Sequence, residues 1–330
     1  MQPNKKLIAI NDNEQKITQM INELVLQPRI NAIKWSDITK QTPNIKIGYP
    51  GQHLASLIAG MYGERTGARG NDLSDGSEVK SCSRVDQLDS CKDCKSPVAR
   101  SEINCPACNS INISRKDDSK WLFSVKNEND LKVLTKDVQR IMLIIGDYPN
   151  FSENDFSTLR FQAFEIWTNS PRCKRFVEIM TNYYNKIYLG HKASDANKTP
   201  APKNFWPYSY QFYICNPVNV FSCTVKNADK KPNIIIDNYV KPETDRSKLD
   251  SVLMPADLLT EEELEIVMAS AKPDELKSYI TVDYSIFKGM SYKDRLKNIK
   301  GLSEKLRSYL SLRETDKIST AKNAYSRRVA

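Results

Sequence analysis

The stretch Gly70-Asn71-Asp72-Leu73-Ser74-Asp75-Gly76-Ser77-Glu78-Val79-Lys80-Ser81 places a carboxylate ahead of a Glu-x-Lys triplet. On a β-strand, residues two apart share a face, so Glu78 and Lys80 point the same way while Val79 points into the core. The spacing predicts a tight hairpin that brings Asp72 directly opposite Glu78. Two carboxylates and one ammonium group would then converge on one face of a sheet.

The turn of this hairpin is predicted to consist of Ser74, Asp75 and Gly76. A three-residue loop favours a type I turn followed by a glycine in the left-handed conformation. Asp75 lies inside this loop and competes with Asp72 for the role of the first acidic residue. The register of the hairpin favours Asp72.

These residue types suit the hydrolysis of a phosphodiester by a metal-activated water. Mg²⁺ is a hard cation that one or two carboxylates hold together with water and phosphate oxygens. The bound metal lowers the pKa of a water molecule and offsets negative charge on phosphorus. A lysine beside it can orient or deprotonate that water and stabilise an anionic transition state. The alternative interpretation is that Glu78 and Lys80 form a surface ion pair, which is common on solvated strands.

The motif Asp72…Glu78-Val79-Lys80 resembles the PD-(D/E)xK nuclease motif, in the compact spacing of the mismatch-repair nicking enzyme MutH and its relatives among type II restriction endonucleases. The stretch from Tyr62 to Arg84 is similar to restriction endonucleases of the MamI type. No proline precedes Asp72, which departs from the usual motif. The resemblance implies an α/β fold with a PD-(D/E)xK restriction-endonuclease-like core, in which a mixed sheet is flanked by helices. It also implies that Asp72 and Glu78 bind Mg²⁺ and that Lys80 activates the attacking water.

Enzymes of this kind also carry a glutamate on the helix before the first motif strand. Residues 52–63 (QHLASLIAGMYG) have the apolar spacing of an amphipathic helix, and Glu64 follows at its end. The resemblance therefore adds Glu64 to the expected catalytic residues.

A second motif consists of two Cys-x-x-Cys pairs. Cys91 and Cys94 are separated by ten residues from Cys105 and Cys108. This spacing is typical of a zinc ribbon, in which four thiolates bind Zn²⁺ tetrahedrally. The alternatives are two disulfides or redox pairs. Disulfides are disfavoured because the N-terminus does not resemble a signal peptide, and a thioredoxin-like site needs one such pair at a helix start. Four protein ligands close the site, so we expect a structural role for zinc.

Composition and charge agree with a nucleic-acid partner. The chain has 330 residues, a net charge of +9 and a pI near 9.0, which favours a polyanionic ligand. Residues 272–330 hold 14 Lys and Arg against 7 Asp and Glu, and Lys293, Arg295, Lys297 and Lys300 follow helical spacing. These charges are either DNA contacts or a solvated helix face. No apolar run is long enough to span a bilayer, so we expect a soluble, cytoplasmic prokaryotic protein that does not bind membranes.

The order of predicted elements divides the chain into three parts. Residues 1–48 are predicted to be a helical region. Residues 49–150 are predicted to form the PD-(D/E)xK nuclease core with the zinc ribbon inserted at 83–112, followed by a strand at 121–125, a helix at 128–137 and a strand at 141–145. Residues 151–330 are predicted to serve DNA recognition and dimerisation, with an α-rich C-terminal region. Within them, the aromatic run 205–213 (FWPYSYQFY) is either core or a base-stacking platform.

Three functional hypotheses remain open. The first is a type II restriction endonuclease that makes Mg²⁺-dependent double-strand cuts at a short specific DNA sequence. Such an enzyme is expected to be a homodimer, because two-fold DNA sites call for two-fold proteins, and to be accompanied by a cognate DNA methyltransferase. The second is a monomeric nicking or repair endonuclease of the same fold. The third is a non-enzymatic zinc-ribbon DNA-binding protein, which would leave the two carboxylates and Lys80 without a role.

Overall fold

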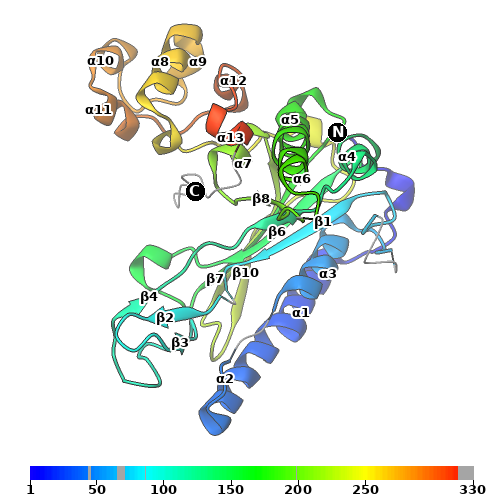
Figure 1. The fold of residues 1–330 in the computed structure, drawn as a ribbon, viewed down its shortest axis with the longest axis vertical. Helices are drawn as coiled ribbons and strands as arrows, with labels where there is room; N and C mark the ends of the chain where they lie inside the picture. Colours follow the sequence, from blue (N-terminus) through cyan, green and yellow to red (C-terminus); the bar gives the residue numbers. More distant parts are fainter. Residues whose placement is uncertain (44–45, 65–70, 86, 198, 319–330) are drawn as a thin grey trace. The chain divides into compact units, whose positions relative to one another are not determined.

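A computed structural model describes residues 1–43, 46–64, 71–85, 87–197 and 199–318 (Figure 1). The chain divides into two compact units. The first comprises residues 1–121, 138–165 and 219–246, and the second comprises residues 122–137, 166–218 and 247–330. The units divide the chain differently from the predicted ranges, because strands from beyond residue 150 complete the sheet of the first unit.

The first unit is built on a five-stranded mixed sheet. In the order in which the strands lie, it contains β1 (Glu78–Ser83), β6 (Ile141–Asp147), β7 (Leu159–Ile166), β9 (Val218–Lys226) and β10 (Asn233–Tyr239). β1 and β6 are parallel, whereas β9 and β10 are antiparallel. All seven residues of β6 are buried, as expected for a central strand covered on both faces. In the part of the chain that the structure describes, β1 lies at an edge with β6 as its only neighbouring strand.

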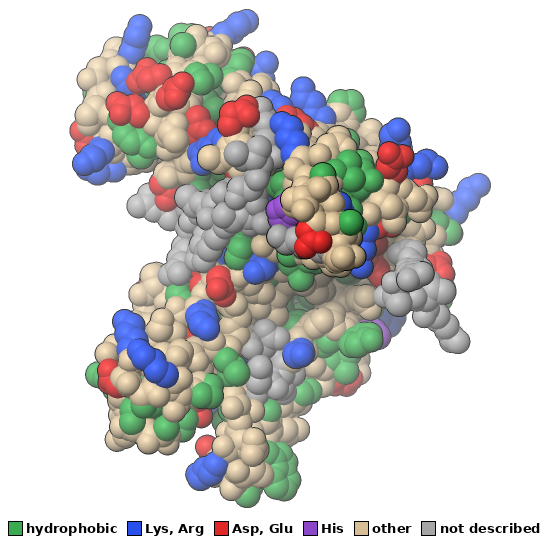
Figure 2. All heavy atoms as spheres, in the orientation of Figure 1, with side chains coloured by type: hydrophobic (Ala, Val, Ile, Leu, Met, Phe, Trp, Pro, Cys, Tyr) green, Lys and Arg blue, Asp and Glu red, His purple; other side chains and the backbone are tan. Residues whose placement is uncertain are grey.

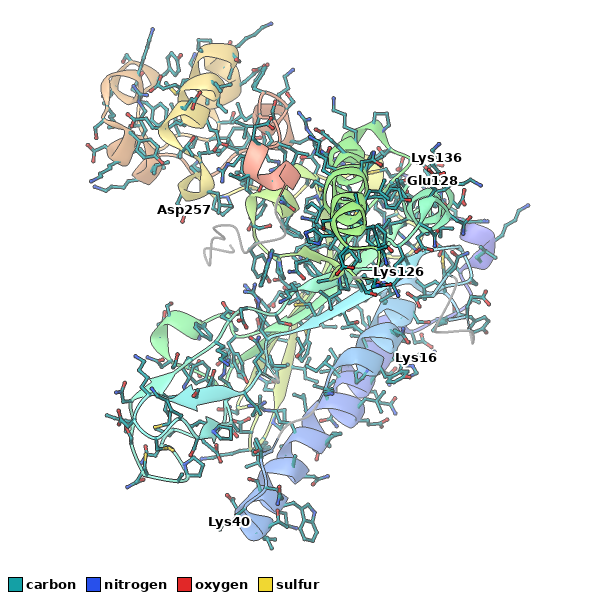
Figure 3. The ribbon with its side chains drawn as sticks, viewed as in Figure 1. Lys16, Lys40, Lys126, Glu128, Lys136 and Asp257 are labelled. Atoms are coloured by element: carbon teal, nitrogen blue, oxygen red, sulfur yellow. The ribbon has the colours of Figure 1, made fainter. Side chains whose placement is uncertain are left out.

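Helices from the N-terminal region cover this sheet. After the short helix η1 (Lys5–Leu7), a continuous helical rod contains α1 (Asn13–Ile21), the π-helical turn η2 (Asn22–Leu26) and α2 (Gln27–Thr39). Its apolar stripe is buried at Ile17, Ile21, Val25 and Leu26, as helical spacing predicts. Lys16 and Lys40 lie toward opposite ends of the rod (Figure 3). The predicted helical character of this region is confirmed.

The helix before the motif is α3 (Gly48–Ala59), which packs against β1, β6 and α1. It begins four residues earlier than predicted, because Gly48-Tyr49-Pro50-Gly51 forms its first turn and is not a break. Proline is tolerated there since its missing N–H would have no helical partner. Gly51 allows a close approach to β1, because a Cβ at this position would overlap Ser81 Oγ.

The predicted ribbon forms a separate three-stranded sheet in the order β3-β2-β4. Its strands are β2 (Asp89–Cys91), β3 (Pro97–Val98) and β4 (Ile113–Ser114). Both pairings are antiparallel. The short helix η4 (Phe151–Glu153) follows β6.

The second unit is mainly helical. It contains a two-stranded sheet of β5 (Trp121–Phe123) and β8 (Lys203–Phe205), with α4 (Glu128–Lys132), η3 (Val133–Asp137), η5 (Pro171–Cys173), α5 (Lys174–Asn182), η6 (Tyr183–Tyr188), α6 (Leu189–Ser194) and α7 (Tyr210–Ile214). The C-terminal part adds η7 (Arg246–Lys248), η8 (Ala256–Leu258), α8 (Glu261–Ser270), α9 (Pro273–Lys277), α10 (Tyr284–Gly289), α11 (Tyr292–Lys297), α12 (Glu304–Arg307) and α13 (Glu314–Ile318). None of the described helices is long and apolar enough to cross a membrane.

The aromatic run at 205–213 belongs to the core of the second unit. Every residue of the run is buried. The Phe205 ring packs edge-on against Phe123 and Phe176, with centroids 6.0 and 5.9 Å apart. Such edge-to-face pairs stabilise a core beyond the area that they bury. The interpretation as core therefore holds, and these rings offer no exposed base-stacking platform.

Candidate active site and four-cysteine cluster

The predicted turn before β1 is present. Gly76 N–H donates to Leu73 O at 2.9 Å, and Gly76 has a φ of +82°, the left-handed conformation that the turn requires. Leu73 N–H donates to Ser77 O at 3.2 Å, which places the two residues opposite each other. The three-residue loop of Ser74, Asp75 and Gly76 is therefore confirmed.

The strand that was predicted to carry Asp72 and pair with β1 is absent from the described residues. Leu73 instead forms an antiparallel bridge with Gly63. The Val79 N–H, on the free edge of β1, donates to Asp72 Oδ2 at 2.7 Å. The side chain of Asp72 thus takes the place of a main-chain acceptor, and one hydrogen bond ties it to the strand that carries Glu78.

Glu78 and Lys80 lie on the same face of β1, as their spacing predicts. Lys80 Nζ donates to Glu78 Oε1, and the two side chains are 27% and 19% exposed. Val79 between them is buried. Both polar side chains are therefore held by the strand yet remain accessible to solvent.

Electrostatics bring Asp72 into the same site. Burial raises the pKa of Glu78 above its ordinary value; Lys80 opposes this rise, whereas the negative charge of Asp72 adds to it. A cation would stabilise the ionised form of Glu78 at a site where a neighbouring carboxylate disfavours it. The structure therefore brings together three of the four predicted catalytic residues.

Asp75, the rival for the first acidic role, occupies a different environment. Its side chain is 3% exposed, and its Oδ2 lies 2.6 Å from Arg140 Nη2. Its Oδ1 accepts a hydrogen bond from Ser77 N–H at 3.0 Å. A carboxylate engaged on both oxygens and sealed from solvent has no coordination position to offer a metal.

The resemblance implied that Glu64 belongs to the helix before the motif, but Glu64 lies outside α3. The helix α3 ends at Ala59, and Glu64 is an exposed residue of the extended segment that pairs with the motif. Its N–H donates to Asp72 O at 2.9 Å, so its main chain is close to the site. Residues 65–70, part of the stretch that carries the MamI-type resemblance, lie outside the described residues.

Sequence reasoning missed Gln52, which lies in the second turn of α3. Its Nε2 donates to Asp72 Oδ1 at 3.5 Å, the long limit of a hydrogen bond. The signal was present, because Gln52 is a polar residue in a helix predicted to precede the motif. Its face could not be assigned, however, without knowing that the helix begins at Gly48.

The four predicted cysteines form one cluster. Their sulfur atoms all lie within 4.8 Å of one another, with Cys91 Sγ 3.6 Å from Cys108 Sγ and Cys94 Sγ 3.5 Å from Cys105 Sγ. Tetrahedral zinc with bonds of about 2.3 Å separates its sulfur ligands by about 3.8 Å, so the donor set fits this metal. Among the described residues, this is the only group of three or more potential ligands that converges in this way.

The two halves of the cluster share one local geometry. Cys91 N–H donates to Ser96 O, and Cys105 N–H donates to Ser110 O, at 2.9 and 2.8 Å. Four residues after the first cysteine of each pair, Lys95 and Asn109 adopt the left-handed conformation and return an N–H to that cysteine's carbonyl. Each pair is therefore a tight turn that presents its sulfur atoms to a common centre.

Arg100 forms a buried ion pair within the ribbon and stacks on aromatic rings from the rest of the first unit. Arg100 Nε lies 2.8 Å from Asp89 Oδ2, and Asp89 has no exposed side-chain surface. The Arg100 guanidinium also lies 5.4, 5.1 and 5.2 Å from the ring centres of Tyr148, Phe151 and Phe156. Stacking of a desolvated guanidinium on aromatic rings stabilises such a contact. Arg100 thus connects the ribbon with the rest of the first unit.

Arg84 and Gln87, just past β1, are engaged in contacts within the first unit. Arg84 is buried and pairs with Asp117 at 3.0 Å, while Gln87 donates to Asp118 at 2.5 Å. Arg84 is therefore a poor candidate for reading bases.

The basic C-terminal helices are also more balanced than their composition indicates. Figure 2 shows acidic and basic side chains intermixed over them. Arg295 pairs with Glu265, and Lys297 with Asp294 at 3.2 Å, whereas Lys293 and Lys300 are exposed. Residues 319–330, which hold part of the predicted basic tail, lie outside the described residues.

Comparison with known proteins relates this arrangement to one family. The family model described as MamI restriction endonuclease matches residues 34–257, which is more than half of the 330-residue chain. The type II restriction enzyme MamI of Microbacterium ammoniaphilum is 38% identical over 56 residues, which make up 17% of this chain and 18% of that enzyme. The aligned segment thus spans less than two thirds of the curated relative. No solved structure matches the chain.

Proposed function

The chain belongs to the MamI restriction endonuclease family, and from this premise we propose that it is a type II restriction endonuclease that cuts both strands of duplex DNA at a short specific sequence. The observation that carries the proposal is the grouping of Asp72, Glu78 and Lys80 at the start of an accessible edge strand. The range that the family model matches includes all three residues.

The two carboxylates fit a divalent cation. Asp72 and Glu78 offer the oxygen ligands that Mg²⁺ prefers, and the effect of Asp72 on the pKa of Glu78 indicates a site with excess negative charge. When bound, Mg²⁺ would lower the pKa of a water molecule and offset charge on the phosphate. We propose that Asp72 and Glu78 hold this ion, with one Asp72 oxygen fixed by the Val79 N–H.

Lys80 is proposed as the residue that handles the attacking water. Its ammonium pairs with Glu78, which holds Nζ beside the proposed metal ligand. From there the ammonium can orient the water and place positive charge near the anionic transition state, whereas only the neutral amine form of Lys80 could accept a proton from the water. Gln52 would orient Asp72 from α3, and Glu64 would assist from the exposed segment beside the motif.

We propose Zn²⁺ for the four-cysteine cluster, with a structural role. The four thiolates leave no open coordination position for a substrate. Their cysteine turns lie on a ribbon whose Arg100 stacks on Tyr148, Phe151 and Phe156 of the first unit. The metal would therefore stiffen a projecting element that contributes to DNA recognition.

The proposed biological context is a restriction–modification system. A homodimer would cut a two-fold DNA site with two equivalent active centres, and a cognate methyltransferase would protect the host DNA. The region 151–330 is proposed to contribute to DNA recognition and dimerisation. A cytoplasmic location would follow from this role.

Digestion of a sequenced plasmid with Mg²⁺, followed by mapping of the ends, tests the proposed function. Discrete, reproducible double-strand ends would support a type II restriction endonuclease, whereas persistent open circles produced by a monomer would point to the nicking enzyme. A Lys80→Ala variant that retains every measured function, together with absence of cleavage by the wild type, would favour a non-enzymatic DNA-binding protein.

A further inference from the structure

A fully buried arginine lies directly behind the proposed metal site. Arg140 immediately precedes β6, and its guanidinium has no exposed surface. It donates to three oxygen atoms: Nη2 to Asp75 Oδ2 at 2.6 Å, Nε to Ser77 Oγ at 3.0 Å and Nη1 to Glu165 Oε1 at 3.0 Å. Two of the three partners belong to the turn that connects Asp72 to Glu78.

The main chain of Arg140 holds the same turn. Arg140 O accepts a hydrogen bond from Glu78 N–H at 3.0 Å. This bond starts the pairing of β1 with β6, in which Glu78 lies opposite Ile141. Arg140 therefore holds the turn through its side chain, and it holds Glu78, the proposed metal ligand, through its carbonyl oxygen.

Glu165, the third oxygen partner of Arg140, also pairs with a second buried arginine, Arg246. Glu165 Oε2 lies 3.2 Å from Arg246 Nε, and neither side chain is exposed. Arg246 Nη1 also donates to the carbonyl oxygens of Lys241, Pro242 and Thr244. The buried group contains two guanidinium and two carboxylate side chains, so its formal charge is balanced. It joins the turn to β7 and to the segment after β10.

We propose that Arg140 is a positioning residue that sets the separation of Asp72 and Glu78 by clamping the turn between them. This inference rests on the proposed function, because it concerns the geometry of the proposed metal site. Arg140 does not touch the reacting atoms in this arrangement. It acts through Asp75 and Ser77, which explains why an acid lies in the loop without serving as a metal ligand.

The planar fork of the guanidinium is what suits this position. Five N–H donors in fixed directions allow one side chain to serve three acceptors on two separate segments, which a single ammonium group on a flexible stem cannot do. Because Arg140 and Asp75 are buried, loss of either partner would leave an unpaired charge, which is costly. The turn is therefore held in one arrangement and not in several.

The test uses Asp75→Asn, which keeps the size of the side chain and removes the charge that faces Arg140. Asp147→Asn is the matched control, because Asp147 is a similarly buried carboxylate at the other end of β6 and accepts both Nε and Nη2 of Arg160, at 2.9 and 2.7 Å. Arg140→Lys is the second variant, should Asp75→Asn fail to fold. All variants are made in the zinc-loaded full chain.

Two quantities are measured on each variant. The first is the hydrogen-exchange rate of the Val79 amide, which reports whether the Asp72 carboxylate stays in place. The second is the dissociation constant for Mn²⁺ alone, with Asp72→Ala as the reference for binding at this site. We expect Asp75→Asn to speed Val79 exchange by about tenfold and to weaken Mn²⁺ binding by a similar factor, whereas Asp147→Asn changes neither.

The outcomes separate the two proposals. Faster Val79 exchange and weaker Mn²⁺ binding in Asp75→Asn or Arg140→Lys, but not in Asp147→Asn, support the positioning role. Wild-type exchange and wild-type Mn²⁺ affinity in folded Asp75→Asn overturn it, as does an equal effect of Asp147→Asn. A wild type that neither binds Mn²⁺ nor cleaves DNA overturns the proposed function instead, and the exchange rates then still decide whether Arg140 clamps the turn.

Discussion

The Asp72 carboxylate accepts a hydrogen bond from the Val79 N–H at 2.7 Å, so a proposed metal ligand also caps the free edge of the catalytic strand. Of its two oxygens, Oδ2 is committed to this contact, while Oδ1, within the described part of the chain, has the long contact with Gln52 at 3.5 Å. An ion held at Asp72 would therefore bind mainly through Oδ1. The same bond couples occupancy of the site to the order of the strand.

Replacement of Lys80 by alanine is expected to lower the rate of DNA cleavage by about 100-fold or more, because general acid–base and charge stabilisation at the phosphate would be lost. DNA affinity should change little, since a single exposed cation contributes weakly to a large interface. Single-turnover cleavage and a binding titration without metal measure the two effects. Lys16→Ala, on α1 and remote from β1, is the control and should cleave at the wild-type rate.

Glu78→Gln is expected to stabilise the zinc-loaded, Mg²⁺-free protein at neutral pH. Burial raises the pKa of Glu78 in the folded state, so its ionised form carries a penalty that is present above the folded pKa and is relieved as the pH falls below it. A neutral amide removes this penalty at neutral pH. Urea unfolding between about pH 4 and 8, in Mg²⁺-free buffer without chelator so that zinc stays bound, tests the sign.

The opposite result, a variant less stable than the wild type at neutral pH, would show that the pair with Lys80 outweighs burial. The same shift predicts that Mg²⁺ affinity of the wild type falls as the pH decreases, because protons and metal compete for Glu78. Glu78→Gln should bind Mg²⁺ weakly across the whole range.

Cys94→Ser is expected to lose most of the bound zinc and to lower the melting temperature by about 5 °C or more, because metal binding is coupled to folding of the ribbon. Hydrogen bonds from Ser96 lower the pKa of the Cys94 thiol to about 6, which favours the thiolate that a metal needs. Zinc content and thermal unfolding are the measurements. Cys223→Ser, at a buried cysteine of β9 outside the cluster, should keep its zinc; equal zinc in both variants would contradict the assignment.

Arg100→Ala is expected to destabilise the protein by about 3 kcal/mol, because it leaves the carboxylate of Asp89 buried and partly uncompensated. Arg115, whose Nη1 lies 2.9 Å from the same carboxylate, offsets part of the loss. Urea unfolding measures the change. Arg100→Lys should recover only part of it, since an ammonium cannot match the stacking on three rings. Full stability of Arg100→Ala would mean that the ribbon does not need this anchor.

The parts of the fold that the sequence predicted are those with local signals. Gly76 after Asp75 marks the turn, the apolar run at 141–145 marks β6, and the spacing of Cys91 to Cys108 marks the ribbon. Each of these elements depends on residues close together in the chain, so the local sequence is enough to predict it.

The parts that were missed depend on distant pairings. Residues 121–123 were predicted within the nuclease core, yet β5 pairs with β8, some 80 residues later. Arg140 and Asp75 lie 65 positions apart, and no local pattern marks an arginine as buried. The site residues in a short motif could therefore be found in advance, whereas their supporting contacts could not.

The ribbon occurs in the segment that joins the parallel strands β1 and β6, after Lys80, the last proposed catalytic residue, and before Arg140, which is proposed to clamp the turn. A module inserted at this point can change in length or in surface without altering the register of either strand. Exchange of ribbons between relatives would therefore be a route by which one cleavage centre acquires new DNA sites. Grafting another ribbon between residues 88 and 117 is the corresponding engineering opportunity, provided that the new ribbon carries a guanidinium in the place of Arg100 to stack on Tyr148, Phe151 and Phe156.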